Sequence, residues 1–168
     1  MLVAAVAFCS LGASGKVVAG ALGQLAVPAR YDASYRSLAF PNGDVDWRRG
    51  ACTDVVVRAL RAAGHDLQSL VFEDRKRQGL PTDRNIDHRR VKALAPFFRR
   101  HGRSLPLDGE WRPGDIVCWV LDSGLDHTGI VSHRRGPSGR LKVVHNLSQT
   151  AEEDVLEKWR IVGHFRFP

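Results

Sequence analysis

Three residues of this chain carry side chains that act together in covalent catalysis, namely Cys52, His127 and His145. A cysteine thiolate is a nucleophile, a histidine can serve as its general base, and a further polar group can orient that base. Cys52 stands just before a run with helical periodicity, and the unpaired N–H groups and dipole of a helix start lower a thiol pKa. Free cysteines are more often small buried hydrophobic residues. The sequence therefore predicts that Cys52 is either the nucleophile of a cysteine hydrolase or a structural thiol.

The two histidines belong to neighbouring runs of β-forming residues, 128–132 and 141–146. A turn centred on Gly136-Pro137 pairs His127 directly with His145 and places both rings on one face of a hairpin, with Cβ atoms about 5 Å apart. A slip of one residue would send the rings to opposite faces. The pattern thus predicts a histidine pair whose contact depends on the hairpin register.

Three further polar residues are candidates for substrate binding: Asp54, Arg89 and Asn146. Asp54 is expected to stabilise a helix N-terminus, with a substrate contact as the alternative. Arg89, beside Arg90, can clamp a carboxylate or lie solvated at a helix start. Asn146 can hold a histidine or a substrate carbonyl, or form a turn at the end of its strand.

The other thiol and histidines have structural explanations. Cys118 shares the strand parity of Ile116 and Val120, which predicts a buried core thiol. The remaining histidines are expected to be structural or solvated; they are His65, His88, His101, His133 and His164. No C-x-x-C spacing is present, so the sequence predicts no metal site and implies no cofactor.

The spacing of apolar residues predicts the elements that hold these side chains. Helices are favoured over 16–26, 53–63 and 88–101, with Gly64 ending the second and Asp87 capping the third. Pro96 is expected to kink the third helix or to divide it into two shorter ones. Strand patterns follow at 116–121, 128–132, 141–146 and 161–167, and the turn-rich segment 30–49 is expected to be a surface loop. Helices followed by antiparallel strands indicate an α+β fold.

Length and composition fit one exported domain. A chain of 168 residues with 43% hydrophobic residues can bury its own core. Residues 1–15 look like the apolar part of a secretory signal that lacks its basic start, which leaves 16–168 as the domain. The apolar run is shorter than the roughly 20 residues of a transmembrane helix. We therefore expect a periplasmic or secreted protein, in which Cys52 and Cys118 can form a disulfide.

The net charge of +7 is spread as arginine pairs between apolar runs. Such a surface suits a polyanion such as nucleic acid, anionic lipid or an acidic cell-wall polymer, or is simply solvated. No zinc-finger spacing, helix-turn-helix cue or aromatic-basic RNA pattern is present, so sequence-specific nucleic-acid recognition is not expected. The pattern predicts no particular oligomeric state.

Several short motifs resemble known families. The runs GDIV (114–117), HTGIV (127–131) and VVHN (143–146) resemble core-strand motifs of NlpC-type papain-like cell-wall peptidases, and ACTD (51–54) stands where those enzymes begin their nucleophile helix. More closely, RGACTDVV (49–56), NIDHRRV (85–91) and HTGIVS (127–132) resemble the bacterial family called domain of unknown function 1287, over residues 24–167.

This resemblance implies a papain-like fold in which Cys52 is the nucleophile, His127 the general base and His145 the residue that orients His127. It also implies hydrolysis of amide bonds in peptidoglycan peptides. The related peptidases carry Ser-Gly after the cysteine where this chain has Thr53-Asp54, so Asp54 adds negative charge beside the substrate path. The alternatives are a non-catalytic cell-wall-binding module of the same fold and an acyltransferase that resolves the thioester with an amine or alcohol.

Overall fold

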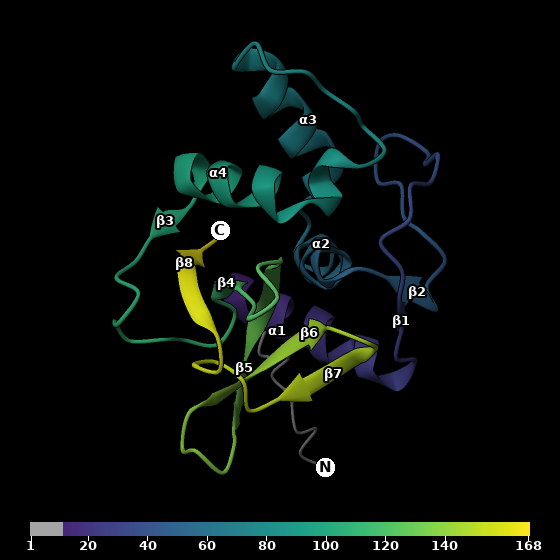
Figure 1. Ribbon diagram of the computed structural model, residues 1–168. Helices are drawn as coiled ribbons and strands as arrows, with labels where there is room; N and C mark the ends of the chain where they lie inside the picture. The colour runs from purple at the N-terminus through teal and green to yellow at the C-terminus, as the bar shows by residue number, and fades with distance from the viewer. Residues whose placement is uncertain (1–11) are drawn as a thin grey trace, which may run out of the picture.

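An antiparallel sheet forms one layer of the structure, a computed structural model that describes residues 12–168 (Figure 1). Six strands of the described chain pair in the order β3-β8-β4-β5-β6-β7. Their bounds are Arg103–Ser104 (β3), Ile116–Val120 (β4), Asp126–Arg135 (β5), Leu141–Asn146 (β6), Thr150–Glu153 (β7) and Arg160–Arg166 (β8). Two short parallel strands, β1 (Arg30–Tyr31) and β2 (Arg49–Gly50), bracket the loop that leads into the helix beginning at Cys52.

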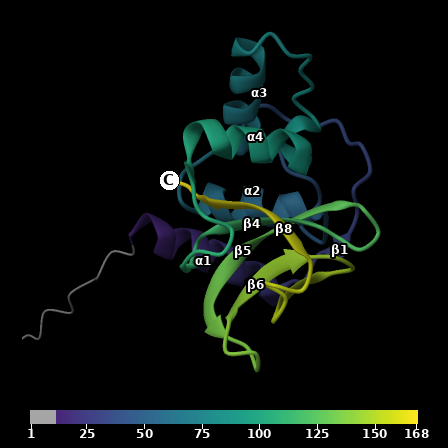
Figure 2. The ribbon, with the colours of Figure 1, turned by 60° about the vertical axis from the view of Figure 1, so that its left-hand side comes forward.

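Helices form the second layer. The described chain contains α1 (Ala13–Gly23), α2 (Cys52–Ala62), α3 (Leu67–Arg77) and α4 (Val91–His101), with 3-10 turns η1 (Gln24–Ala26) and η2 (Asp87–Arg89). Figures 1 and 2 show α3 and α4 on one side of α2 and the central strands on the other. All four helices contribute to one apolar core with one face of the sheet. The predicted α+β fold is confirmed.

The central helix α2 is held by packing rather than by intrinsic propensity. Its sequence contains Val55, Val56 and Val57, and β-branched residues disfavour helix. All three valines are buried, as is almost every residue from Cys52 to Leu60. Close approach of α1 depends on Gly20, where an added Cβ would lie 2.5 Å from the Cβ of Ala62. Burial on every side therefore fixes α2, and with it the position of Cys52.

Strand alternation divides the sheet into two buried faces. Ile116, Cys118 and Ile130 point toward the helices and join the main core. Val117 and Trp119, one position out of phase, belong to a second apolar cluster on the opposite face. Alternate residues along a strand therefore face opposite sides of the sheet, one side toward the helices and the other toward the second cluster.

The β5–β6 register differs from the prediction by two residues. Gly129, not His127, pairs with His145, and Val131 pairs with Val143. The direct pairing of His127 with His145 was therefore wrong, because β5 runs on to Arg135 with an irregularity after Val131 that the sequence did not reveal. Since side chains alternate with period two, a two-residue slip keeps both rings on the same face.

The predicted helix over 88–101 is divided at Arg90 instead of at Pro96. Arg90 is extended, with φ −122° and ψ 126°, and α4 runs through Pro96 without ending. The predicted N-cap is also wrong, because the Asp87 carboxylate accepts the N–H of Asp83 at 2.7 Å. The preceding residue Arg89 is tied to α2 through buried contacts, which explains why the break occurs there.

Sequence patterns did not predict α3, β3 or β7. In α3 the buried apolar residues are only Leu67 and Val71, and its last turn is basic, so its helical period is faint. The strand β7 reads Thr-Ala-Glu-Glu and lacks the alternation that marks a half-buried strand.

The predicted signal segment 1–15 falls mostly on residues 1–11, which lie outside the described residues. Of its last residues, Ala13 to Gly15 form the first turn of α1, whose Val17 and Val18 are buried in the domain. Within residues 12–168, no helix has both the length and the apolar character needed to cross a bilayer.

Candidate active site

Cys52 is the first residue of α2 and borders an open cleft of about 250 Å³. The cleft lies between β1, the start of α2, the start of α4 and the loop before β5. Its lining includes Tyr31, Cys52, Arg90, Lys92, Leu125 and Asp126. The cysteine is 5% exposed, so it lies at the inner end of this cleft.

The surroundings of the sulfur favour a neutral thiol. Burial raises the pKa of Cys52 to about 12, and hydrogen bonding to the N–H groups of Thr128 and Thr53 offsets only part of that rise. The negative charge of Asp54 raises the pKa further. The predicted lowering of this pKa by the helix start is therefore wrong for the resting structure, because desolvation of the thiolate outweighs the helix N-terminus.

The structure brings His127 and His145 together. The Nε2 atom of His127 lies 2.9 Å from the Nδ1 atom of His145, and the rings are nearly perpendicular at 86°. Burial, with a smaller contribution from His145, lowers the pKa of His127 to about 3. Burial also lowers the pKa of His145. Both imidazoles are therefore neutral near pH 7, which is the form in which a histidine can accept a proton.

Two tryptophans enclose this pair, and the sequence analysis did not single them out. Trp119 stacks beside His127 with ring centroids 5.6 Å apart, and its indole N–H donates to the carbonyl of Leu156 at 2.9 Å. Trp159 packs edge-on against both histidines, at 5.8 and 6.1 Å. The direct pairing of Trp119 with His127 in the β4–β5 ladder explains the first contact, and only the register reveals it.

A third partner, Glu153 on β7, was also missed. Its Oε2 atom lies 2.8 Å from Nε2 of His145, although the approach is not aligned with the ring N–H. The side chain of Glu153 is 51% exposed, so it reaches the buried ring from the solvent side. The sequence offered no signal for this contact because β7 itself was not predicted.

Gly129 makes room for His145. A Cβ atom on Gly129 would lie 2.6 Å from a methyl carbon of Val143 and 3.0 Å from the Cβ of His145. The glycine is needed for this close approach of two strands, not for an unusual backbone conformation. It thereby allows the two histidines to meet across a diagonal of the hairpin.

Cys52 is adjacent to the histidine pair but does not contact it directly. Within residues 12–168 no hydrogen bond joins Cys52 to either ring, and the sulfur instead meets the N–H of Thr128, the residue after His127. By parity His127 shares the sheet face of Trp119, whereas Thr128 faces the helices. The candidate nucleophile on α2 therefore meets β5 at Thr128 from the helix side, whereas the ring of the preceding residue, His127, lies on the opposite face of the sheet.

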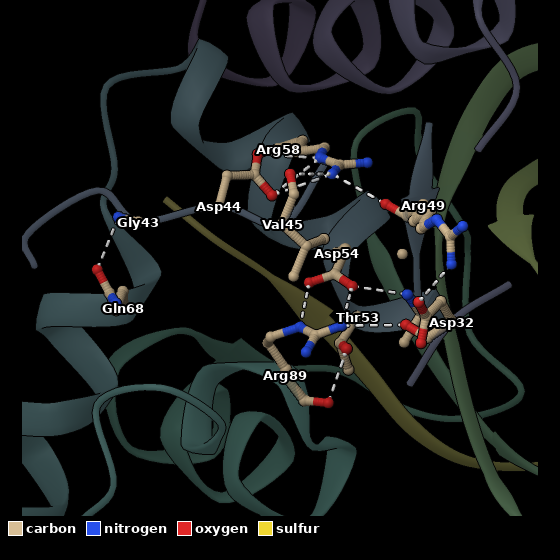
Figure 3. A network of polar contacts seen from close by, with 12 residues as sticks. Asp32, Gly43, Asp44, Val45, Arg49, Thr53, Asp54, Arg58, Gln68 and Arg89 are labelled. Atoms are coloured by element: carbon tan, nitrogen blue, oxygen red, sulfur yellow. Dashed lines mark hydrogen bonds and ion pairs between the residues drawn. The ribbon is translucent and has the colours of Figure 1, made fainter. Parts of the chain in front are cut away.

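Asp54 and Arg89 are buried and bind each other (Figure 3). The guanidinium group donates to both carboxylate oxygens, at 2.9 and 3.0 Å. Asp54 also accepts the N–H of Ala51 at 2.6 Å, as expected of a residue that stabilises the start of α2. Arg89 further donates to the carbonyls of Asp32 and Ser34. The pair therefore anchors the helix start and the loop beside the cleft, and its charges are already neutralised.

A second arginine anchors the rest of that loop. Arg58 of α2 donates to both carboxylate oxygens of Asp44 and to the carbonyl of Arg49 at 3.1 Å (Figure 3). The predicted surface loop 30–49 is thus tied to α2 at two points, one through Arg89 and one through Arg58.

Comparison with known proteins agrees with the motifs RGACTDVV, NIDHRRV and HTGIVS of the sequence. The family model described as Domain of unknown function (DUF1287) matches residues 18–167. The "Uncharacterized protein YijF" of Escherichia coli (strain K12) is 44% identical over 161 residues, covering 88% of this chain and 78% of that protein. The chain belongs to the DUF1287 family. The predicted membership of the DUF1287 family is therefore confirmed.

In this DUF1287 domain Asn146 has a structural position. Its side-chain amide donates to the carbonyls of Ala29 and Gly50, at 3.0 and 2.9 Å, and the residue is fully buried. These bonds fix the chain segment that enters α2 against the end of β6. Within residues 12–168 the Asn146 side chain therefore hydrogen-bonds to neither histidine ring, and long-range bonds take the place of the turn predicted for it.

Cys118 of the DUF1287 domain is a buried core residue, as predicted. It is 1% exposed, and its thiol lies 3.6 Å from the Thr128 hydroxyl. Among the described residues Cys52 and Cys118 are both free, so the disulfide considered from the sequence is not formed here. The described residues also contain no group of three or more His, Cys, Asp or Glu side chains arranged to hold a metal ion.

Proposed function

We propose that this DUF1287 domain is an exported cysteine hydrolase that cuts amide bonds in peptides of the bacterial cell wall. The observation that carries the proposal is the position of Cys52 at the start of a buried helix, at the inner end of an open cleft and beside the strand residue next to His127. A helix bearing the cysteine against an antiparallel sheet bearing the histidines supports the proposal, because the resemblance to papain-like peptidases implies such an arrangement. A chain with net charge +7 would also be attracted to an anionic wall.

In the proposed reaction His127 takes the Cys52 proton as the sulfur attacks the substrate carbonyl. The new S–C bond gives a tetrahedral intermediate, which collapses as the C–N bond breaks and His127 returns the proton to the leaving amine. Water then hydrolyses the thioester and regenerates the thiol. Because burial disfavours both charged forms, proton transfer accompanies attack instead of preceding it.

Two features of the site bear on this mechanism. As the first residue of α2, Cys52 has no intrahelical acceptor for its N–H, which is therefore a candidate oxyanion donor worth about 2.7 to 4 kcal/mol in the transition state. The thiol and the His127 ring share no hydrogen bond within residues 12–168, so in this mechanism the ring must move toward the sulfur when substrate enters. Apo catalytic contacts are commonly long and tighten in the substrate complex.

The test is mass spectrometry of purified peptidoglycan fragments incubated with the wild-type protein, Cys52→Ser and Cys118→Ala. We expect new fragments from the wild type and from Cys118→Ala, the matched thiol control in the core. We expect none from Cys52→Ser, since a hydroxyl is a much weaker acid and nucleophile than a thiol.

Cleavage by Cys52→Ser would refute the mechanism. Retention of the protein on intact peptidoglycan without any cleavage would instead support the wall-binding module. Fragments that incorporate an added amine would indicate acyl transfer, because the same thioester can be resolved by an amine in place of water.

A further inference from the structure

We propose that Glu153 is a positioning residue that determines which ring nitrogen of His145, and through it of His127, carries the proton. Two contacts in series support this: Glu153 to His145 at 2.8 Å and His145 to His127 at 2.9 Å. Within residues 12–168, Nδ1 of His127 forms no hydrogen bond. For two neutral rings, the groups that can donate or accept at each contact determine which nitrogen carries the proton.

The first step concerns His145. A carboxylate 2.8 Å away favours a proton on the His145 nitrogen that faces it, since its oxygens accept hydrogen bonds and carry negative charge, even though the approach is off the line of the ring N–H. That nitrogen is Nε2. A neutral imidazole has one N–H and one bare nitrogen, and burial keeps this ring neutral by lowering its pKa. Nδ1 of His145 is therefore bare and acts as an acceptor.

The second step passes the constraint to His127. The contact between the rings joins Nε2 of His127 to the bare Nδ1 of His145, so His127 must donate from Nε2. His127 is also neutral, since burial lowers its pKa to about 3. Its remaining nitrogen, Nδ1, is then bare and free to accept a proton. One carboxylate on β7 thus selects the tautomer of two rings in succession.

Without Glu153, a second placement of the protons on His127 and His145 gives the two rings the same number of hydrogen bonds. In that arrangement His145 donates from Nδ1 to Nε2 of His127. His127 then carries its own proton on Nδ1, so this nitrogen cannot accept another proton as a base. The positive charge of Lys158 also lowers the pKa of His145. Within residues 12–168, Lys158 forms no hydrogen bond to the ring, so it does not select a tautomer. The carboxylate is the group that breaks the symmetry.

The position of Glu153 suits this role and its test. It pairs with Val143 on β6, two residues from His145, so its side chain reaches the ring diagonally across the ladder. Because the side chain is half exposed, it can be replaced without creating a buried cavity. The role of the bare His127 nitrogen as a base rests on the proposed function. The tautomers of the two rings do not depend on that function.

The experiment is ¹⁵N NMR of histidine-labelled protein at pH 7, with the two rings assigned by signal loss in His127→Gln and His145→Gln. In the wild type we expect protonated Nε2 and unprotonated Nδ1 signals for both rings. Glu153→Lys places a donor where the acceptor stood, so we expect both rings to switch to protonated Nδ1. Glu153→Gln should retain the wild-type pattern, because its amide oxygen still accepts.

Glu157→Lys is the matched control, since it reverses the charge of an exposed glutamate that pairs with Arg140 instead. It should leave both tautomers unchanged. Unchanged tautomers in Glu153→Lys, or protonated Nδ1 in the wild type, would overturn the proposal. Neither result depends on peptide cleavage, so failure of this proposal is distinguishable from failure of the proposed function. Loss of cleavage in Glu153→Lys with retention in Glu153→Gln would link the two.

Discussion

At the scale of single residues, burial sets the protonation of the candidate catalytic pair. Desolvation raises the pKa of the Cys52 thiol and lowers that of the His127 imidazole, so both groups rest in their neutral forms. A helix start favours a thiolate, but here the sulfur is 5% exposed and Asp54 adds negative charge nearby. The resting site is therefore a thiol beside a neutral base, activated only when a substrate is present.

The pH dependence of alkylation tests this state. Iodoacetamide reacts with the thiolate, and with a pKa of about 12 the thiolate fraction of Cys52 grows about tenfold per pH unit below that value. We expect the alkylation rate at Cys52, followed by peptide mapping, to rise from pH 7 to pH 10 without a plateau. A synthetic peptide of residues 49–56 is the control and should level off above about pH 8.5. A plateau near neutral pH in the folded protein would indicate a resting thiolate–imidazolium pair.

At the scale of elements, one buried ion pair joins three segments. Arg89 from η2 binds Asp54 at the start of α2 and the carbonyls of the loop after β1, while the Thr53 hydroxyl donates to the Arg89 carbonyl at 2.9 Å. Both charged side chains are almost fully buried, at 2% and 3% exposure. The pair thus explains how a helix without a side-chain N-cap keeps its first residue in place.

Arg89→Met should destabilise the protein severely. It leaves the Asp54 carboxylate buried without its cation, and breaking a buried pair from one side typically costs about 3 to 5 kcal/mol in the free energy of unfolding. Urea unfolding followed by circular dichroism measures the change. The control is Arg49→Ala, which removes the exposed partner of Asp32 and should leave the urea midpoint nearly unchanged. Equal effects of the two variants would contradict the structural role of Arg89.

At the scale of the whole molecule, positive charge gathers at the mouth of the cleft. Arg90 and Lys92 are exposed there, and neither forms an ion pair among residues 12–168. The cleft also contains Asp126, but the net charge of the chain is +7. Unpaired cations at the entrance should raise the local concentration of anionic reagents and substrates.

Two reagents that differ by one negative charge can measure this field. We expect Arg90→Gln with Lys92→Gln to lower the iodoacetate-to-iodoacetamide rate ratio at Cys52 at pH 9, by about threefold per charge for groups roughly 7 Å apart in water. Salt at 1 M should reduce the wild-type ratio similarly, since the Debye length falls to about 3 Å. Lys76→Gln with Arg77→Gln on α3 is the control for net charge. A ratio that follows net charge regardless of position would argue against a local effect.

The sequence by itself determined the α+β order of elements, the main helices and strands, and the family. Helical and strand periodicity depends on residues close together in the chain, so α2 and the strands β4, β6 and β8 were predicted near their true bounds. For β5 only the central part, 128–132, was predicted. The candidate residues Cys52, His127 and His145 were also visible, because their types and neighbours form short contiguous motifs. Asp54 was recognised as a helix-start residue for the same reason.

Only the tertiary structure decided the pairing of distant groups. The hairpin register, the reach of Glu153 from β7 and the burial of Arg89 against Asp54 depend on residues far apart in the chain. Burial likewise reversed the expected pKa shift of Cys52, since desolvation depends on everything packed around the sulfur. Contacts and solvent exclusion are properties of the packed chain as a whole, which is why local sequence patterns do not specify them.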